Sequence, residues 1–516
     1  MTAGRALDAA ALASAAATLA VILTGGLRVG RLALTRPEDF VLATTMLVGL
    51  RALMTPLALP RVVAARAVSV AVAVYVAALG FIAVSRHLAL RTHAFDLGQY
   101  LQIIWNIAHG HGPASTLVPT YVVADRMQAW GDHFSPIFYA LAPLQWLAPG
   151  AVSLLLAQTV ALAAGAVALF QLAWPRVGRD AAAAFAVLYL ANPSLHGINI
   201  RDIHPAAFAI PLVLAAALAF DRGRYGWCAM ALVGTLACRE DAAIGVVGFA
   251  AWLVLARGRW LAGAVLAVVA TAILAVDIAW LMPRFLGGTY DHLNRYRHLG
   301  DSLGQILVSI AVRPWRWVGI VLTPAKLAYL GALLAPLAFL PLLAPRVLAA
   351  AVPGIAMNLL SLDPKLIHYQ GQYQAFVLPF LMLAAVEGYA RLREIVGPRR
   401  LFGRHGAASA LGVAFVLSAM LTSRIVNDLG VTFWRLGPSQ HAAYALMARV
   451  PADAPVSAYE RLVPHLATRP DVWMFPRGLG EAEYVLERAS VAVPSERFEA
   501  IARDGPWVLW RRRAPP

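Results

Sequence analysis

The chain has 516 residues and is 60% hydrophobic, with 14% charged residues, a formal net charge of +16 and two cysteines. A soluble domain carries about 25% charged residues, so this composition excludes an ordinary soluble protein and indicates a membrane protein. Most of the arginines lie in short loops between apolar runs, a pattern that is typical of membrane topology and argues against a nucleic-acid partner.

Thirteen apolar runs predict about thirteen transmembrane helices, several of them short, because a helix needs about 20 apolar residues to cross a bilayer. In chain order the runs are Ala9–Leu27, Phe40–Leu59, Ala67–Leu88, Val152–Trp174, Ala181–Leu190, Ala206–Phe220, Trp227–Ala237, Ala242–Leu255, Leu261–Leu281, Leu327–Leu343, Val347–Leu360, Ala375–Tyr389 and Ala407–Leu421. No clear small-residue cleavage site follows the first run, so we expect an uncleaved anchor there. The cysteines Cys228 and Cys238 have apolar neighbours and indicate neither a disulfide framework nor a zinc site.

Arginines in the short loops predict which side of the membrane faces the cytoplasm. If the runs alternate, one side receives Arg61, Arg66, Arg176, Arg179, Arg222, Arg224, Arg257, Arg259, Arg346 and the basic segment 391–404. The arginine-containing loop 28–38 falls on the other side, so the number of N-terminal spans stays open. That other, extracytoplasmic side also receives the long first loop 85–133, the loops 192–204, 238–241, 283–324 and 361–374, and the C-terminal region.

The region 426–516 differs in kind from the rest of the chain. "APVSAYERLVPHLATRPDVWMFP" predicts a strand, a helical piece and a second strand, and "AEYVLERASVAV" and "GPWVLWRRR" predict two further strands. We therefore expect a small extracytoplasmic α/β domain at 426–516, after an N-terminal transmembrane extension at 1–66 and a transmembrane domain at 67–425. The α/β region has no Gly-rich phosphate loop and no obvious nucleophile motif.

Acids, histidines and bases gather in the loops predicted to face outside. In loop order they are Asp96, Asp132 and His133, then Arg201, Asp202 and His204, then Arg239, Glu240 and Asp241, and finally Asp363, Lys365, His368 and Tyr369. Ionisable residues near membrane depth are costly and are often functional. The pattern therefore predicts a site on the outer face.

These residues also have structural explanations. Asp96 followed by Gln99 fits an N-cap with its capping-box partner, and His204 before Pro205 fits the start of a helix. Asp241 fits a cap for the next span.

Other polar stretches also have both a functional and a structural interpretation. The three consecutive charges of 239–241 exceed what a cap requires, and their structural explanation is a solvated loop tip with a local ion pair. Asp363 before Pro364 is a turn signal. The "HGHG" stretch at 109–112 is a weak metal motif, and we favour a flexible turn there.

Five motifs, in this order, carry a resemblance to a known family: "FDLGQYLQIIWN", "DHFSPIFYALAPL", "NPSLHGINIRDIHPAAFAIPLVLAAALAF", "ACREDAAIGVVGFAAWL" and "VSAYERLVPHLATRP". They resemble a bacterial and archaeal family of predicted multi-pass membrane proteins of unknown function, which is assigned to the GT-C glycosyltransferase superfamily. The resemblance covers about residues 70–513 and leaves 1–66 uncovered.

The resemblance implies an all-α polytopic membrane fold of GT-C type. It implies a cell-membrane enzyme that takes a sugar from a polyprenyl-phosphate lipid and transfers it, on the extracytoplasmic face, to a glycan, lipid or protein acceptor. In that superfamily an acid of the first outer loop is central, and Asp96 matches its position. Some members add a divalent cation such as Mg²⁺ or Mn²⁺, but they usually carry paired acids there. Here Leu97 follows Asp96, so a metal requirement stays open.

An inverting transfer assigns roles to the outer-loop residues. Asp96 is the expected base for the acceptor hydroxyl, and Arg201, Arg239 and Lys365 are expected to neutralise the leaving phosphate. An acceptor pocket or cation site is expected from Asp132, His133, Asp202, His204, Glu240, Asp241, His368 and Tyr369. We expect the prenyl chain between spans near the first-loop helix. The spacing of Leu97, Leu101, Ile104 and Ala108 predicts that this helix lies on the membrane surface.

Two other classes of function remain open. One is a transporter or flippase of lipid-linked glycans, and the other is a non-catalytic scaffold or sensor whose C-terminal domain binds a partner. The polar clusters lie at one face rather than at the bilayer midplane, which favours an enzyme. Convergence of Asp96, Asp202, Glu240 and His368 on one cavity would support a single catalytic site.

Overall fold

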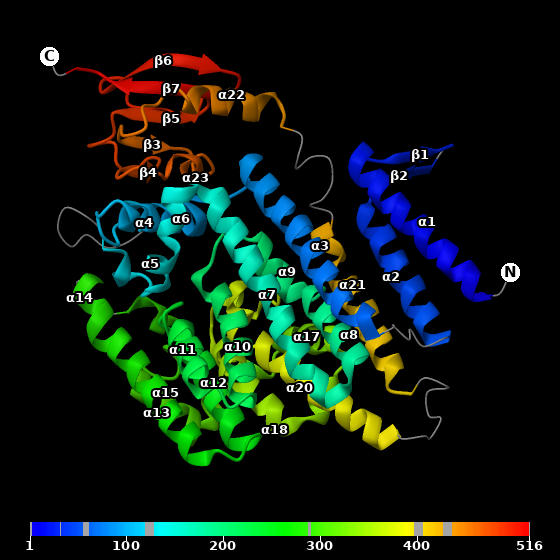
Figure 1. Cartoon of the computed structure of the whole chain (residues 1–516). Coiled ribbons are helices and arrows are strands. Elements are labelled where there is room, and N and C mark those ends of the chain that lie inside the picture. Colours follow the sequence, from blue (N-terminus) through cyan, green and yellow to red (C-terminus); the bar gives the residue numbers. More distant parts are fainter. Residues whose placement is uncertain are drawn as a thin grey trace.

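The computed structural model describes residues 3–30, 32–54, 61–118, 128–286, 290–396, 406–426 and 436–514. A large body of helices carries a small sheet at the C-terminal end of the chain (Figure 1). This confirms the predicted class of a helical membrane protein with a small C-terminal sheet. Outside the described residues lie the end of the second apolar run at 55–59, the predicted cytoplasmic arginines Arg399, Arg400 and Arg404, and positions 427–435 at the start of the predicted C-terminal domain.

Helices α1 (Ala3–Thr24) and α2 (Pro37–Met54) form a pair at the edge of the helical body (Figure 1). An antiparallel hairpin of β1 (Leu27–Val29) and β2 (Leu32–Leu34) connects them. Helix α2 packs against α21 (Ala408–Val426), while most of α1 is exposed. An outward apolar surface of this kind suits contact with lipid, so the first run has the properties predicted for a membrane anchor.

Four helices in the described ranges are long and apolar enough to cross a membrane, namely Ala3–Thr24, Ala64–Leu88, Ala151–Val177 and Trp260–Phe285. Two bent pairs raise the number to six, Arg179–Leu190 with Pro193–Ile200 at 42° and Pro314–Val321 with Pro324–Leu337 at 67°. The predicted number of thirteen spans is not confirmed, because many of the apolar runs form helices of only 10–17 residues. Breaks at prolines and at polar loops shorten these helices below the length that a bilayer requires.

The helical body follows the order of the chain. Its helices are α3 (Arg61–Leu88), α7 (Ala151–Val177), α8 (Arg179–Leu190), α9 (Pro193–Ile200), α10 (Ala209–Asp221), α11 (Tyr225–Leu236), α12 (Ala242–Leu255), α13 (Trp260–Val276), α14 (Met282–Leu286), α15 (Leu303–Val312), α16 (Val318–Val321), α17 (Pro324–Leu334), α18 (Pro345–Leu348), α19 (Val352–Leu360), α20 (Leu378–Val396) and α21. Short irregular helical segments join them, among them η3 (Pro205–Phe208), η4 (Asp277–Leu281), η5 (Asp291–Tyr296), η10 (Pro364–Ile367) and η11 (Gln372–Phe376).

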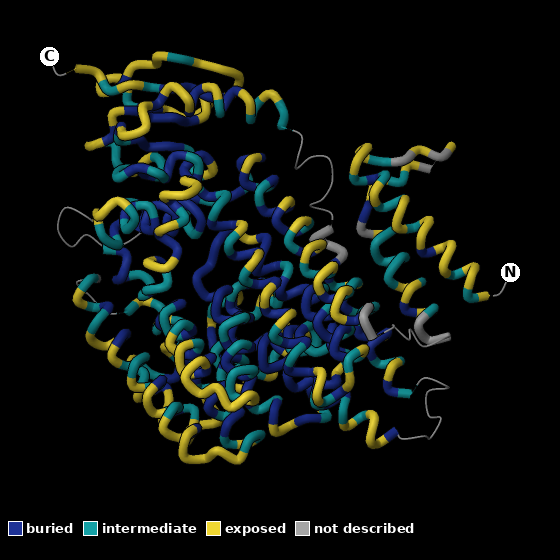
Figure 2. Tube along the Cα trace, in the orientation of Figure 1, coloured by how far each residue is buried: buried dark blue, intermediate teal, exposed yellow. Residues whose placement is uncertain are grey.

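Small residues allow the central helices of this body to approach one another closely, as is common in membrane bundles. A Cβ on Gly165 of α7 would collide with the Tyr189 side chain of α8, and a Cβ on Gly388 of α20 would collide with the backbone of Leu340. One continuous core of buried residues includes parts of α3, α7, α8, α10, α12 and α20, while the outer helices α13 and α15 expose much of their surface (Figure 2).

The predicted first outer loop is largely structured. It contains η1 (Ala94–Gly98), α4 (Gln99–Ala108) and η2 (Ala129–Gly131), and α5 (Ile137–Leu141) and α6 (Pro143–Leu147) follow it. The expectation that α4 lies on the membrane surface is wrong, since Leu97, Leu101 and Ile104 are fully buried. An apolar helix face predicts burial but not the partner: α5 and α6 pack against α4, and the C-terminal region covers a neighbouring face, where Gly98 abuts Val463 and Gln102 donates to the Pro470 carbonyl at 2.8 Å.

The C-terminal sheet has the strand order β4-β3-β5-β7-β6. Its strands are β3 (Val456–Ala458), β4 (Val472–Met474), β5 (Tyr484–Arg488), β6 (Phe498–Asp504) and β7 (Trp507–Arg512), and α22 (Pro438–Met447) and α23 (Val463–Leu466) accompany them. The four predicted strands are present, with β3 parallel to β4 and β5. Strand β6 was missed because it is an exposed edge strand whose sequence, "FEAIARD", is rich in charge.

Candidate functional site

Six of the residues predicted for the site line one cavity of about 620 Å³. They are Asp96, Arg201, Asp202, His204, Lys365 and His368. Three loops that lie far apart in sequence therefore meet at one place. Of the four residues proposed for the convergence test, Asp96, Asp202 and His368 line this cavity, whereas Glu240 lies in a neighbouring cluster.

Asp96 occupies an irregular turn rather than a helix cap. Its φ of 66° and ψ of −92° lie in a strained region that non-glycine residues rarely adopt, and strain of this kind concentrates at functional sites. Helix α4 begins after Gly98, and in the described chain no side chain caps it by a hydrogen bond. The capping-box interpretation is therefore wrong. The Asp96 side chain is 46% exposed, and its Oδ1 lies 4.0 Å from Nδ1 of His204.

Asp202 is a second carboxyl group facing the cavity, and it too has a positive φ, of 44°. Its Oδ2 accepts a hydrogen bond from the backbone N–H of His93 at 3.2 Å, while its buried Oδ1 has no partner in the described residues. Burial and the negative charge of Asp96 raise the pKa of Asp202 to about 7. Asp202 therefore exchanges a proton near neutral pH, which is a property of many catalytic sites.

Gln158, a buried residue of α7, holds the loop that carries Asp202 and His204. Its Nε2 donates to the Asp202 carbonyl at 3.0 Å, and its Oε1 accepts from the His204 backbone N–H at 2.8 Å. Proline at 205 begins η3 directly after His204, which confirms the predicted helix start. Burial lowers the pKa of His204, although the charge of Asp96 opposes this shift. A neutral His204 beside Asp96 can accept or donate a hydrogen bond.

Positive side chains complete the cavity wall. Arg201, Lys365 and Arg86 line it, and the Arg201 guanidinium lies 3.4 Å from Nε2 of His368. Burial and the charge of Arg201 lower the pKa of His368. Asp363 accepts from the backbone N–H of Lys365 at 3.0 Å, which confirms the predicted turn. With three basic residues beside two carboxyl groups, the cavity has the charge to hold an anion near a base.

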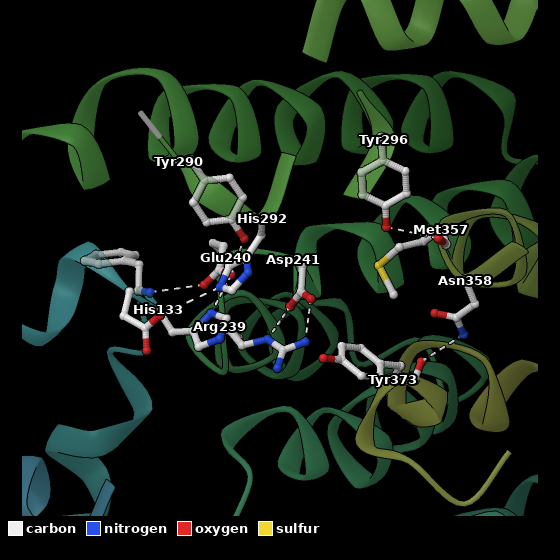
Figure 3. Close-up of polar contacts among 12 residues, drawn as sticks. His133, Arg239, Glu240, Asp241, Tyr290, His292, Tyr296, Met357, Asn358 and Tyr373 are labelled. Carbon is white, nitrogen blue, oxygen red and sulfur yellow. Dashed lines mark hydrogen bonds and ion pairs between the residues drawn. The ribbon is translucent and has the colours of Figure 1, made fainter. Parts of the chain in front are cut away.

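A neighbouring cluster contains most of the remaining predicted residues (Figure 3). Glu240 Oε1 lies 2.8 Å from His133 Nδ1 and accepts a hydrogen bond from Tyr290 at 2.7 Å, while Oε2 accepts from the Phe134 backbone at 3.1 Å. Burial opposes a charge on His133, but the carboxylates of Glu240 and Asp132 outweigh burial and raise the pKa of His133. Both carboxylate oxygens of Glu240 therefore have hydrogen-bond partners among the neighbouring residues.

Asp132, His133 and His292 form a group that could hold a metal ion. Their potential ligand atoms all lie within 4.8 Å of one another. Gln99 donates to Asp132 Oδ2 at 2.9 Å, Glu240 Oε1 lies 2.8 Å from His133 Nδ1, and His292 Nε2 lies 3.7 Å from Asp132 Oδ1. Outer partners that orient ligands in this way are usual around protein metal sites.

Arg239 and Asp241 bind one another rather than the cavity (Figure 3). The guanidinium donates to both carboxylate oxygens, from Nε at 2.6 Å and from a terminal nitrogen at 2.5 Å. Arg239 is 2% exposed. The ion pair of the structural explanation is therefore present, but the solvated loop tip is wrong. Asp241 precedes α12 without capping it by a side-chain hydrogen bond in the described chain, so the cap expected there is also wrong.

Tyr369 does not line the cavity. Its hydroxyl donates to the Leu421 carbonyl at 3.3 Å, and its ring stacks with His368 at 5.9 Å between centroids. Its position suggests that it supports His368. At the "HGHG" stretch, His109 stacks on Trp105 at 4.0 Å, and the only three-residue metal group among the described residues lies elsewhere.

An apolar groove of about 290 Å³ adjoins the cavity and shares Tyr373 with it. Asp241, Tyr290 and His292 lie along it together with Tyr373. The remaining wall consists mainly of aliphatic side chains of α12, α13, α15 and α19, among them Ile244, Val247, Leu274, Leu303, Ile306 and Met357. The groove thus combines a long apolar wall with polar groups next to the charged cavity.

Apart from the closeness of His93 to Asp96, no sequence pattern singles out His93, Arg86, Tyr290 or His292. Arg86 ends a long apolar helix, which is also where topology alone places arginine. His93 lies three residues before Asp96, and its Nδ1 is 2.7 Å from Glu460 Oε1 in the C-terminal region. That contact spans 367 positions, so no local pattern indicates it. Proximity of His93 to Asp96 was the one usable signal.

The fold and site define a helical membrane protein with an anion-compatible, carboxyl-containing cavity. The chain belongs to the family described as predicted membrane protein DUF2079, whose model matches residues 86–504. A search of the curated proteins found no match. Two crystal structures of ArnT from Cupriavidus metallidurans, bound to undecaprenyl phosphate and in the apo state, are similar to this chain at 14% identity, with TM-scores of 0.48 and 0.47. Each comparison covers 85% of this chain and 97% of the ArnT chain.

Proposed function

We propose that this protein is a membrane glycosyltransferase that transfers a sugar from a polyprenyl-phosphate donor to an acceptor hydroxyl at the extracytoplasmic face. The observation that carries the proposal is the placement of Asp96 in one cavity with Arg86, Arg201 and Lys365. A base and several cations in one cavity are what transfer from a phosphate leaving group requires. The acceptor is a glycan, lipid or protein.

In the proposed reaction, the acceptor oxygen forms a bond to the anomeric carbon while the bond from that carbon to the phosphate oxygen breaks. The acceptor proton passes to the Asp96 carboxylate, and the electron pair leaves with the polyprenyl phosphate. Arg201 and Lys365 neutralise the negative charge that develops on this phosphate, since charge-assisted hydrogen bonds are the strong ones. His204, 4.0 Å from Asp96, orients the base.

The apolar groove supports a lipid donor. Its aliphatic wall suits a prenyl chain, and Tyr373 lines both the groove and the cavity. The prenyl chain of the donor would then lie between α12, α13, α15 and α19, with the donor phosphate toward Arg201 and Lys365. This places the lipid between helices, as expected from the sequence, but beside η5 and its residue His292 rather than along α4.

A divalent cation fits the group of Asp132, His133 and His292. Two imidazoles and a carboxylate favour a transition metal over Mg²⁺, which prefers oxygen ligands, and Mn²⁺ is the transition metal that shares the preference of Mg²⁺ for carboxylate. When bound there, the ion would supply positive charge next to the groove. The purified protein should bind one equivalent of Mn²⁺ by elemental analysis, and His292→Gln should lose it while His298→Gln keeps it. Equal metal content in all three proteins would refute the site.

A transporter of lipid-linked glycans is the second candidate, because α9, the second half of the bent pair α8–α9, ends at Ile200 directly before the cavity residue Arg201. Movement of a labelled lipid-linked sugar across vesicles without a new glycosidic bond would favour this candidate. Formation of the bond would favour the transferase.

The decisive experiment uses the full chain in lipid vesicles with polyprenyl-phosphate sugars as donors. Asp96→Asn should lower transfer by about 10²–10⁴-fold, the usual contribution of a general base. Asparagine tolerates a positive φ well, so the thermal unfolding midpoint should not change. Asp301→Asn, an exposed acid of a later outer loop, is the matched control. Full transfer by Asp96→Asn would exclude Asp96 as the base.

A further inference from the structure

A second charged cavity lies at the end of the helical body remote from Asp96. Gln158, which holds the site loop, is near the start of α7, and Arg176 follows 18 residues later in the same helix, about 27 Å along its axis at 1.5 Å per residue. Arg176 lines a cavity of about 170 Å³ together with Arg257, Arg346, Arg391 and Glu387. The arginine pattern predicts that this end of the protein faces the cytoplasm.

The positive charge of this cavity is only partly neutralised. Arg176 lies 2.5 Å from Asp221 and 3.4 Å from Glu387, and Arg257 lies 2.8 Å from Asp221. Arg391 donates to the Leu343 carbonyl, a neutral group, at 3.0 Å. Among the described residues Arg346 has no hydrogen-bond or ion-pair partner. Four guanidinium groups thus meet two carboxylates, which leaves two positive charges for a ligand.

Topology alone does not explain this arrangement. A preference for arginine on the cytoplasmic side is satisfied by any exposed arginine, and Arg346 and Arg391 are exposed, as Arg224 and Arg259 are. What distinguishes Arg346 and Arg391 is that they line one cavity. Here α7, the turn after α12, α18 and α20 each direct a guanidinium to the same cavity. Convergence of like charges is unfavourable unless an anion lies between them.

We propose that this cavity binds the phosphate group of an anionic membrane phospholipid. Arginine matches phosphate geometry with two parallel hydrogen bonds, and basic pockets between membrane helices hold anionic head groups. Apolar side chains including Leu172, Trp252, Val347 and Leu383 form the rest of the wall, which suits the start of an acyl glycerol. A water molecule takes about 30 Å³, so the cavity has room for a head-group phosphate but not for a large sugar-linked lipid.

The test uses the full chain in neutral phosphatidylcholine nanodiscs, with phosphatidylglycerol added and bound lipid counted by native mass spectrometry. The wild type should retain one phosphatidylglycerol, and Arg346→Gln/Arg391→Gln should bind it at least tenfold more weakly. Arg224→Gln/Arg259→Gln removes the same charge from the same end outside the cavity and should bind as the wild type does. Arg346→Gln alone, whose arginine has no partner among the described residues, should show part of the loss if the double variant folds poorly.

Two outcomes would overturn the proposal. One is equal weakening in the cavity variant and the Arg224/Arg259 control, which would mean that general charge attracts the lipid. The other is Arg346-dependent binding of inorganic phosphate without retention of phosphatidylglycerol, which would exclude a lipid as the source of the phosphate group. Neither result bears on Asp96, so the proposed transferase activity is tested separately.

Discussion

The cavity around Asp96 and the neighbouring cluster around Glu240 contain the same kinds of residue, acids, histidines and arginine, in opposite states. In the cluster, His133, Tyr290 and Arg239 each contact a carboxylate at 2.8 Å or less. In the cavity, Asp96 lies 4.0 Å from His204, and one oxygen of Asp202 has no described partner. Buried polar groups are normally satisfied, so we expect a substrate to bind at the cavity, where polar groups lack partners, and the fully paired cluster to act as a rigid support.

The comparison predicts that substitutions in the cluster reduce the stability of the fold more than they reduce the rate of transfer. Arg239→Met leaves the partly buried Asp241 without its partner, and we expect unfolding to become easier by up to about 3 kcal/mol, the lower end of the loss for a buried pair. The double variant Arg239→Met/Asp241→Leu should recover most of that loss, because an apolar pair of similar volume is often neutral. Chemical unfolding in detergent measures both. A single variant as stable as the wild type would mean that the pair is not structurally important.

For the cavity we expect the opposite: substitutions there should lower transfer without lowering stability. Arg201→Gln and Lys365→Gln should each lower kcat/KM for a polyprenyl-phosphate donor by about 10–100-fold, since a hydrogen bond to a charged group contributes about 1.5–3 kcal/mol. Their unfolding midpoints should stay at the wild-type value, because each side chain lines a cavity rather than a packed core. Arg297→Gln, on η5's C-terminal side, is a control of the same charge change. Destabilisation without loss of transfer would reverse the roles of cavity and cluster.

The sequence was most informative about which residues share a face. Asp96, Asp202, Lys365 and His368 converge because each lies in a loop between apolar segments, and alternation places such loops together. Local patterns could not distinguish a cap from a strained turn at Asp96, since "DLGQ" satisfies the capping rule whatever the backbone φ.

The sequence alone could not predict contacts between residues that lie far apart in the chain. His292 joins Asp132, and Glu460 joins His93, only after the chain has folded. The number of spans stays a prediction for a related reason: an apolar run predicts burial, but a buried helix can be shorter than the bilayer, and several runs form helices of 10–17 residues.

A pH experiment on Asp202 sharpens the difference between the two regions. Because the pKa of Asp202 is raised from its ordinary value of 3.8 to about 7, the folded state holds this proton more tightly than the unfolded state. Its contribution to stability is therefore full below pH 4 and is lost as the pH rises toward 7. Asp202→Asn should remove that loss, so its unfolding midpoint should exceed that of the wild type at pH 8 and match it near pH 4. Identical pH profiles would show that Asp202 is not buried as described.

The contact between Glu460 and His93 should have the smallest effect on stability, although it joins the C-terminal region to the cavity. Both side chains are partly exposed, at 39% and 46%, and pairs of this kind contribute about 0–1 kcal/mol. The backbone N–H of His93, rather than its ring, binds Asp202 at 3.2 Å, so Glu460→Gln should leave that bond in place. We expect an unchanged unfolding midpoint and a few-fold decrease in kcat/KM, measured beside Glu481→Gln as an exposed control in the same region. A loss of transfer as large as that of Asp96→Asn would instead make Glu460 part of the catalytic machinery, and the C-terminal region would then belong to the site rather than to its support.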